Sequence, residues 1–445
     1  MNPEFQRNLW LELPPHRLVS MPAVLVLVFF GAWLAGGSVS FAGAAQTLII
    51  LLLMVWGSRL AADAVLGEVV NHTWDNQRMS AISPWDMTWG KLLGSTCFMW
   101  YGVVWCIAAF LGSPHGDVSQ LVRLLLGGLQ AQALAMVISM VLLRAEPANL
   151  RFQATVAQSI SVILMIPFLY VTMIHRPDVI YWYGFTVGFD GFITVSQMLF
   201  IAWTVMGLYQ IMRAELQYET RSLTWLFFML FMVAYVAGFD RLQDFTSKAG
   251  MPTPAVTRLF VAFCTGIALT YICALIEPKS ALRFSRWLML MRSGRFTHGG
   301  RLAPAWAGAL GVSIVLCLLT AVNIVGVKGM SAPLPQMPLA FLAAILLFLL
   351  RDLAVFYYLV LQGRSGHGGL AIPVYLIAAY FLVPVLMSSA RLDPLLPILL
   401  PSGAGSPVLT MLAPLAEAVV ALVFVLQRWR AMRVEGLEST ATATH

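Results

Sequence analysis

About twelve apolar runs, each close to 20 residues long, dominate this chain. An α-helix needs roughly 20 apolar residues to cross the hydrocarbon core of a bilayer. The runs are continuous rather than alternating, which favours helices over the strands of a β-barrel. They lie at residues 20–37, 43–63, 91–112, 120–143, 154–174, 192–212, 222–239, 255–276, 303–326, 338–361, 371–389 and 407–427. The sequence therefore predicts an all-α, polytopic helical membrane protein with about twelve spans.

The composition agrees with this class, because 60% of the residues are hydrophobic and only 11% are charged. Soluble domains carry about 25% charged residues. All five cysteines lie inside apolar runs and no pair has CxxC spacing, which indicates packing residues rather than metal ligands or redox centres.

Residues 1–20 contain charges and prolines, so no cleavable signal peptide is predicted there. Phe5, Leu9 and Leu13 recur every four residues, and Pro14-Pro15 end the pattern. This spacing predicts an amphipathic helix that lies at the membrane interface before the first span.

Positive charges set the expected orientation. With a cytoplasmic N-terminus, the inner segments hold most of the arginines, and an even number of spans returns the C-terminus to the same side. We therefore expect a multi-pass protein of the inner (plasma) membrane with both termini cytoplasmic. The net charge of +7 follows from this distribution, so the lipid bilayer is expected as a partner and nucleic acid is not.

The two halves of the sequence, residues 1–215 and 216–445, share one layout. Each has two spans, an acidic residue that opens a long cytoplasmic segment (68–91 and 277–301), and four further spans. This order predicts a six-plus-six parallel repeat with diverged copies. The alternative is twelve spans whose loop lengths coincide by chance.

Glu68–Lys91, which reads EVVNHTWDNQRMSAISPWDMTWGK, is the longest polar interval of the first half. Ser83, Pro84 and Asp86 predict a helix start, with the serine as N-cap, the proline at the first helical position and the acid near the positive helix end. A short helix is also predicted from Thr73 to Ala81. On that helix and just after it, the expected apolar contacts are Trp74, Met79 and Ile82, and the expected exposed residues are Asp75, Asn76, Gln77 and Arg78. Such a pair of helices fits either a loop on the lipid headgroups or a docking element for a soluble partner.

The same stretch resembles the segment between the second and third spans of type-2 ABC transporter permeases, the membrane subunits of many bacterial ATP-driven exporters. The residues in register are Thr73, Asp75, Met79, Ser80, Ser83, Pro84, Trp85, Asp86, Gly90 and Lys91. His72 replaces the usual Gly, Ala81 replaces a Pro, and residues 76–78 are polar where apolar residues are usual. The direct match covers about 30 residues, and the second segment keeps the layout without the motif.

The resemblance implies a coupling helix that contacts a cytoplasmic ABC ATPase subunit, present as two copies or a heterodimer. It implies an exporter in which two six-span halves are fused, moving substrate through their interface by alternating access, and it leaves room for further membrane subunits. The expected ATPase-coupling residues are Trp74, Asp75, Arg78, Met79, Ser83, Asp86, Arg283, Arg286 and Trp287. In 277–301, Phe284, Trp287, Leu288 and Met291 can share one face of an amphipathic helix.

No G-x-x-x-x-G-K-[ST] loop occurs, so an ATPase is expected on a separate chain, and neither enzymatic activity nor a cofactor is expected of this one. A membrane enzyme or an assembly scaffold is a third hypothesis. The chain contains no HExxH spacing that would support an enzyme, and the pair His72 and Asp75 does not make a metal site.

Few ionisable residues lie deep inside the apolar runs; Arg351 and Asp352 lie near the middle of the tenth run, and Glu417 lies inside the twelfth. Charges at bilayer depth are costly, so these residues are candidates either for a substrate pathway or for ion pairs that fix helix packing. Adjacent helical residues point to different faces, so Arg351 and Asp352 are not expected simply to neutralise each other. They also support an alternative function, an ion- or proton-coupled secondary transporter that uses all three. Arg59 and Asp63, four apart, are expected to pair locally.

Overall fold

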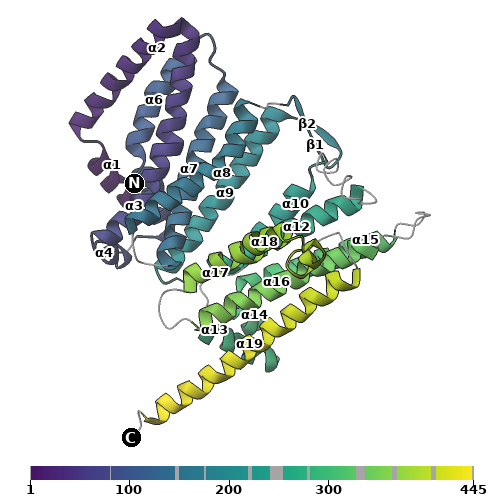
Figure 1. Cartoon of the computed structure of the whole chain (residues 1–445). Coiled ribbons are helices and arrows are strands. Elements are labelled where there is room, and N and C mark those ends of the chain that lie inside the picture. Colours follow the sequence, from purple (N-terminus) through teal and green to yellow (C-terminus); the bar gives the residue numbers. More distant parts are fainter. Residues whose placement is uncertain are drawn as a thin grey trace. The chain divides into compact units, whose positions relative to one another are not determined.

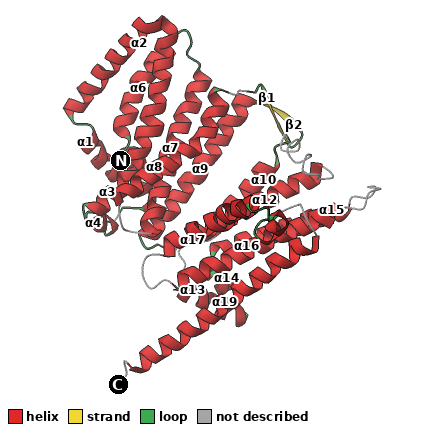
Figure 2. Ribbon diagram, viewed as in Figure 1, coloured by secondary structure: helices red, strands yellow, loops and turns green. Residues whose placement is uncertain are grey.

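The computed structural model describes most of the chain, and most of the described residues are helical (Figure 2). The described residues are 2–80, 82–145, 150–174, 177–218, 223–240, 254–277, 281–326, 336–362, 368–401 and 407–442. The chain divides into two compact units. Unit 1 comprises Met1–Ile180 and Phe185–Thr220, and unit 2 comprises Tyr181–Gly184 and Arg221–His445.

Unit 1 is a bundle of helices with α7 at its centre, since α7 packs against α3, α8 and α9 (Figure 1). Its elements are α1 (Pro3–Glu12), α2 (Pro15–Ile50), the π-helical η1 (Leu51–Trp56), α3 (Gly57–Val70), α4 (Trp74–Arg78), α5 (Pro84–Gly94), α6 (Cys97–Leu111), α7 (Val118–Ala145), α8 (Leu150–Met173) and α9 (Phe189–Glu215). Leu53, Met99 and Leu124 are buried in one core cluster, and Val65, Met136 and Leu208 in a second.

The first two predicted spans are joined by a glycine turn rather than by a loop. Helical geometry breaks at Gly36 and Gly37, and Gly37 has φ of +63°, a left-handed conformation that a side chain disfavours. Figure 1 shows α2 as a bent helix. The second arm continues through η1 and α3 to Val70 without another break.

The predicted amphipathic helix before the first span is α1, and it ends at Glu12, with Leu13 at the C-cap, just before the two prolines. Its buried residue is Glu4, however, whereas Trp10 and Leu11 are mostly exposed. α1 therefore directs the Glu4 carboxylate into the interior of unit 1, because its cationic partner Lys91 lies there.

A short hairpin follows α8, although no strand was predicted. Strands β1 (Val179–Trp182) and β2 (Phe185–Gly188) form a two-stranded sheet. Positive φ angles at Tyr183 (52°) and Gly184 (81°) suit the tight turn between them. In unit 2, this turn contacts the end of α10, where the Trp182 Nε1 donates to the carbonyl of Tyr235 at 3.1 Å.

Unit 2 is built around two long helix pairs, α12 with α15 and α16 with α19. Its helices are α10 (Leu223–Ala237), α12 (Pro254–Ile276), α13 (Ala281–Arg292), α14 (Phe296–Leu302), α15 (Ala305–Gly326), α16 (Gln336–Gln362), α17 (Gly368–Ile377), the π-helical η2 (Ala378–Leu382), α18 (Val383–Ser389), the 3₁₀ turn η3 (Asp393–Ile398) and α19 (Pro407–Thr442). Leu349, Phe263 and Phe356 lie in its core.

Within the described residues, eight helices are long and apolar enough to cross a membrane. A ninth arises if α5 and α6, which meet at a 52° bend, count as one span. Two shorter apolar helices cover Leu223–Ala237 and Val374–Ser389. The predicted class, an all-α polytopic membrane protein, is confirmed.

Candidate functional site

The polar segment Glu68–Lys91 folds into two short helices joined by a turn. Ser83 caps α5 as predicted, because its Oγ accepts the Asp86 amide at 3.1 Å and donates to the Asp86 carboxylate at 2.6 Å. The upstream helix α4 is shorter than predicted. His72, in place of the usual glycine, has a left-handed φ of 57° just before it.

Two expectations for α4 and the residue after it were wrong. Met79 was expected to be an apolar contact, but it is 79% exposed. Gln77 was expected to be exposed, but it is buried. The reason is that α4 ends at Arg78, so Met79 leaves the helix, while Gln77 turns inward to a buried lysine.

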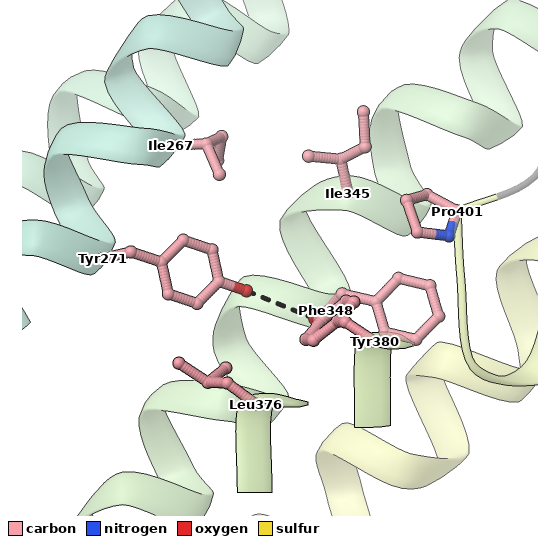
Figure 3. Close-up of a pocket in the computed structure, with 7 residues that line it drawn as sticks. All are labelled: Ile267, Tyr271, Ile345, Phe348, Leu376, Tyr380 and Pro401. Atoms are coloured by element: carbon pink, nitrogen blue, oxygen red, sulfur yellow. Dashed lines mark hydrogen bonds between the residues drawn. The ribbon is translucent and has the colours of Figure 1, made fainter. Parts of the chain in front are cut away.

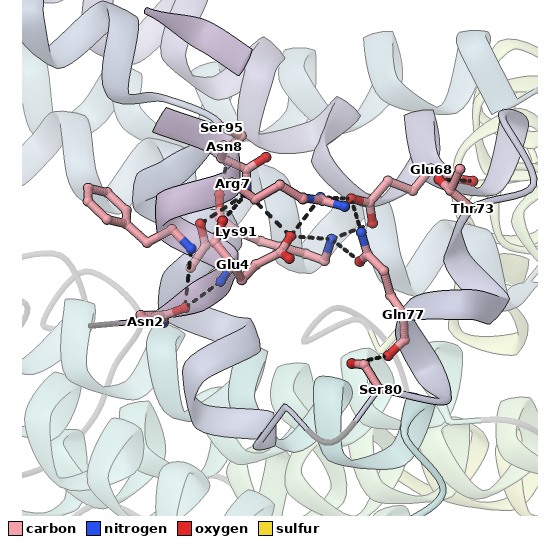
Figure 4. Close-up of polar contacts among 12 residues, drawn as sticks. Asn2, Glu4, Arg7, Asn8, Glu68, Thr73, Gln77, Ser80, Lys91 and Ser95 are labelled. Atoms are coloured by element: carbon pink, nitrogen blue, oxygen red, sulfur yellow. Dashed lines mark hydrogen bonds and ion pairs between the residues drawn. The ribbon is translucent and has the colours of Figure 1, made fainter. Parts of the chain in front are cut away.

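That lysine is Lys91, the centre of a group of four charged residues and one amide that we name the Lys91 cluster: Glu4, Arg7, Glu68, Gln77 and Lys91 (Figure 4). The Lys91 Nζ donates to Glu4 Oε1 at 3.1 Å, to Gln77 Oε1 at 2.7 Å and to the Glu68 carboxylate. All three ammonium protons are thereby used.

Arg7 closes the Lys91 cluster by contacting both carboxylates, Glu4 at 2.8 Å and Glu68 beside it. Two positive charges therefore face two negative ones. The Lys91 side chain is only 1% exposed and that of Glu4 3%. Buried charges are tolerated only when paired in this way. The cluster joins four helices of unit 1, namely α1, α3, α4 and α5.

The glycine before Lys91 is needed for close approach. A Cβ at Gly90 would lie 2.7 Å from the Cβ of Glu4 and 2.9 Å from Asn2 Oδ1. Asn2 in turn donates to the Asp86 carbonyl at 2.6 Å. The Gly-Lys pair of the motif thus has a structural role, which is to seat α1 against α5.

The predicted coupling residues of unit 1 differ in what they expose. Asp75 has an 82% exposed side chain, and Met79 is similarly open. Trp74 is buried, with the Lys91 ammonium 5.2 Å from its ring centroid. Arg78 donates to the Glu215 carbonyl at 3.1 Å and so holds the end of α9. A cavity of about 560 Å³ opens beside α4.

The second predicted coupling segment forms α13 and α14 in unit 2. Arg286 is exposed, Trp287 is half-buried, and the side chain of Arg283 lies outside the described part of the chain. Glu277 Oε2 accepts the backbone amides of Ala305 at 2.8 Å and Trp306 at 3.4 Å. It therefore caps the start of α15, where a helix end favours negative charge.

The three ionisable residues predicted inside spans come together in unit 2. Contrary to expectation, Arg351 and Asp352 do pair, with Nε to Oδ1 at 2.8 Å. A guanidinium on a long side chain can bend back to its neighbour, which the argument from helix faces ignored. Arg351 Nη1 also donates to Glu417 Oε2 at 2.6 Å, which joins α16 to α19. The predicted pair of Arg59 and Asp63 is confirmed at 2.7 Å.

Sequence reasoning missed three tyrosines around Asp352, which is fully buried. Oδ2 accepts the hydroxyls of Tyr271, at 2.7 Å, and Tyr380, while Oδ1 accepts Tyr375 at 2.6 Å and the Arg351 Nε. A carboxylate has about four acceptor positions, so all are filled. The available signal was that a hydroxyl inside a span needs an acceptor.

A cavity of about 370 Å³ lies beside these tyrosines. Its lining comprises Ile267, Tyr271, Ile345, Phe348, Leu376, Tyr380 and Pro401 (Figure 3). Figure 3 shows the hydroxyls of Tyr271 and Tyr380 turned toward each other, and both contact Asp352. The cavity therefore offers an apolar surface, with the charges on the far side of the hydroxyls.

Among the described residues, no group of three or more His, Cys, Asp or Glu side chains could hold a metal ion. Comparisons with protein-family models, with curated proteins and with solved structures find no match to this chain.

Proposed function

We propose that this chain is the membrane subunit of an ATP-driven transporter of the type-2 ABC class, and that a cytoplasmic ATPase subunit docks on α4. The observation that carries the proposal is the Lys91 cluster. It fastens the tip of α4 to α1, α3 and α5, so a force on the tip reaches the helices that enter the membrane.

The exposed part of the tip supports this assignment. Asp75 and Met79 are mostly exposed, and Asp75 forms a solvent-exposed ion pair with Arg78 at 3.5 Å. A loop that only rested on headgroups would not need a buried lysine and two buried or half-buried carboxylates beneath it. Two ATPase copies or a heterodimer would bind the membrane subunit, one of them on α4, and the chain itself would supply no nucleotide site.

Twelve spans, with both termini in the cytoplasm of a plasma-membrane protein, form part of the proposal. The count follows when α2 is divided at Gly37, α5 and α6 count as one span, and the two shorter apolar helices are added. An acidic residue at the end of the second span of each half supports the repeat. Glu68 reaches Lys91 on the helix that leads into the third span, and Glu277 reaches the amides that begin α15.

The direction of transport rests on the family resemblance alone, and we propose export. The apolar cavity beside Tyr271 and the scarcity of charges inside the spans favour an apolar or amphipathic substrate. Alternating access would follow from ATP-driven displacement of α4.

The alternative, an ion-coupled secondary transporter, would use Arg351, Asp352 and Glu417. Four donors occupy the acceptor positions of Asp352, which favours a role of this carboxylate in holding α12, α16, α17 and η2 together. Glu417 retains a 28% exposed side chain. Flux driven by an ion gradient without an ATPase, and abolished by Glu417→Gln, would support this alternative.

The direct test is purification of the tagged chain from its native membrane. We expect an ATPase with a nucleotide-binding loop to accompany it. Asp75→Lys should abolish stimulation of that ATPase by the membrane subunit while leaving the thermal stability of the chain unchanged. Asp178→Lys makes the same charge change at an exposed residue before β1 and is the matched control. Equal loss in both variants, or none in either, would contradict docking at α4.

Arg78 is a poorer probe than its charge suggests. Its Nε holds the carbonyl of Glu215, so Arg78→Glu would disturb the end of α9 as well as any docking surface. Asp75 contacts Arg78 only through a solvent-exposed ion pair at 3.5 Å, which contributes little to stability, and Met79 is 79% exposed. Both are therefore the sharper test.

A further inference from the structure

The two polar segments differ in charge. Residues 68–91 contain three acidic residues against two basic ones. Residues 277–301 contain one acidic residue against six basic ones. The single acid, Glu277, already caps α15, so it leaves the charge of α13 and the turn after it uncompensated.

Four arginines of unit 2 are exposed on or near α13: Arg286, Arg292, Arg295 and Arg430. Within the described part of unit 2, none of them has an ion-pair partner. Met289 lies three residues from both Arg286 and Arg292, hence between them on the helix surface, and it is 60% exposed. An exposed apolar residue flanked by arginines is typical of a helix that lies at a membrane interface.

The opposite face of α13 fixes the depth of the helix. Phe284 packs against Tyr357 near the end of α16, with ring centroids 5.1 Å apart, and against Trp429 of α19 at 5.6 Å. Trp306, at the start of α15, donates through Nε1 to the Tyr357 hydroxyl at 2.7 Å. Tryptophan and tyrosine gather where spans leave the hydrocarbon core. Trp429 also lies close to the end of the apolar part of α19, which reaches Ala431.

We propose that α13 and the turn that follows it bind the anionic headgroups of the bilayer. Phosphate groups of acidic phospholipids contact Arg286, Arg292 and Arg295, and Met289 enters the region of the upper acyl chains. Charge complementarity favours anionic lipid at this surface, because its exposed charged residues are arginines. The contacts of Phe284 with Tyr357 and Trp429 hold the helix at the level of the headgroups. The inference does not depend on an ATPase docking at α4.

The test uses the full-length chain in mild detergent. Phosphatidylglycerol is titrated, with phosphatidylcholine as the zwitterionic comparison, and lipid adducts are counted by native mass spectrometry. We expect tighter binding of phosphatidylglycerol, weakened by salt. Each removed arginine should lower that affinity about fivefold, and R286Q/R292Q/R295Q together about a hundredfold. Binding of phosphatidylcholine should not change.

Arg391→Gln removes an exposed arginine from a different connection and is the control, expected to bind phosphatidylglycerol as the unmodified chain does. If the triple variant does not fold, the single variant Arg286→Gln and the salt titration of the unmodified chain decide. Undiminished phosphatidylglycerol binding in the arginine variants overturns the proposal. So does a result in which these variants keep the lipid but lose a co-purifying soluble protein, because α13 would then be a protein-docking surface.

Discussion

Replacing Lys91 by methionine tests whether the Lys91 cluster is the support of the α4 tip. The substitution keeps the length of the side chain and removes its charge. Glu4 and Glu68 would then face Arg7 alone, with side chains only 3% and 15% exposed. Breaking a buried charge pair in this way costs about 3–5 kcal/mol, because two carboxylates with little access to water then share one cation.

The loss should be measured by equilibrium unfolding in mixed micelles with rising SDS, followed by tryptophan fluorescence. Arg59→Met serves as a comparison, since its pair with Asp63 is 31% and 41% exposed. That pair should contribute less than about 1 kcal/mol to the free energy of unfolding. Lys91→Met should also make the junction between α1 and α2 more open to proteolysis.

A second variant separates charge imbalance from lost packing. Adding Glu68→Gln to Lys91→Met leaves one carboxylate, Glu4, facing one guanidinium, Arg7, and should restore a measurable part of the lost free energy. The supporting role of the Lys91 cluster is refuted if Lys91→Met lowers the free energy of unfolding no more than Arg59→Met does. It is also refuted if the double variant is as unstable as the sum of its two single changes.

Three further outcomes follow from the contacts described above. Gly90→Ala should lower the free energy of unfolding by about 1–3 kcal/mol through overpacking against α1, whereas Gly67→Ala, which meets no atom within 4 Å, should be neutral or stabilising in the same SDS titration. The hydrogen bond from Arg258 holds the pKa of Asp240 below its usual range. The stability that this bond contributes is present above the unfolded pKa of about 4 and is lost as the pH falls through the lower folded pKa. R258Q should therefore make the melting temperature less dependent on pH below about 4. Asp352→Asn should cost about 3–5 kcal/mol, since an amide nitrogen would face groups that all donate; an unchanged melting temperature would contradict the four-donor arrangement.

Much of the local structure could be predicted from short-range patterns. Ser83, Pro84 and Asp86 specify the start of α5 because a cap acts over three residues. Arg59 and Asp63 specify their own pair because residues four apart on a helix are neighbours. The prolines after Leu13 end α1 for the same kind of local reason.

The errors at Gln77 and at the pair of Arg351 and Asp352 arose where burial, rather than local spacing, decides a side chain's partner. Gln77 reads as a polar surface residue, yet Lys91 and Glu68 require its amide inside the cluster. Arg351 and Asp352 read as residues on different faces, but burial leaves the guanidinium no better acceptors than the adjacent carboxylate and Glu417. Local spacing carries no information on such partners.

By itself, the sequence determined that this protein crosses a membrane through helices, because a bilayer accepts only long apolar segments whose backbone groups are paired internally. It also predicted many of the helix ends to within a few residues, although α3 continues to Val70, past the predicted end at 63, and α19 to Thr442, past 427. Only the tertiary structure decided which charges are buried together. The pairing of Lys91 with Glu4, 87 positions apart, and the enclosure of Asp352 by three tyrosines depend on how the helices pack. An unpaired charge is costly where it is buried, so the packing of the helices determines which charges pair. The same packing leaves Asp75 and Met79 exposed at the tip.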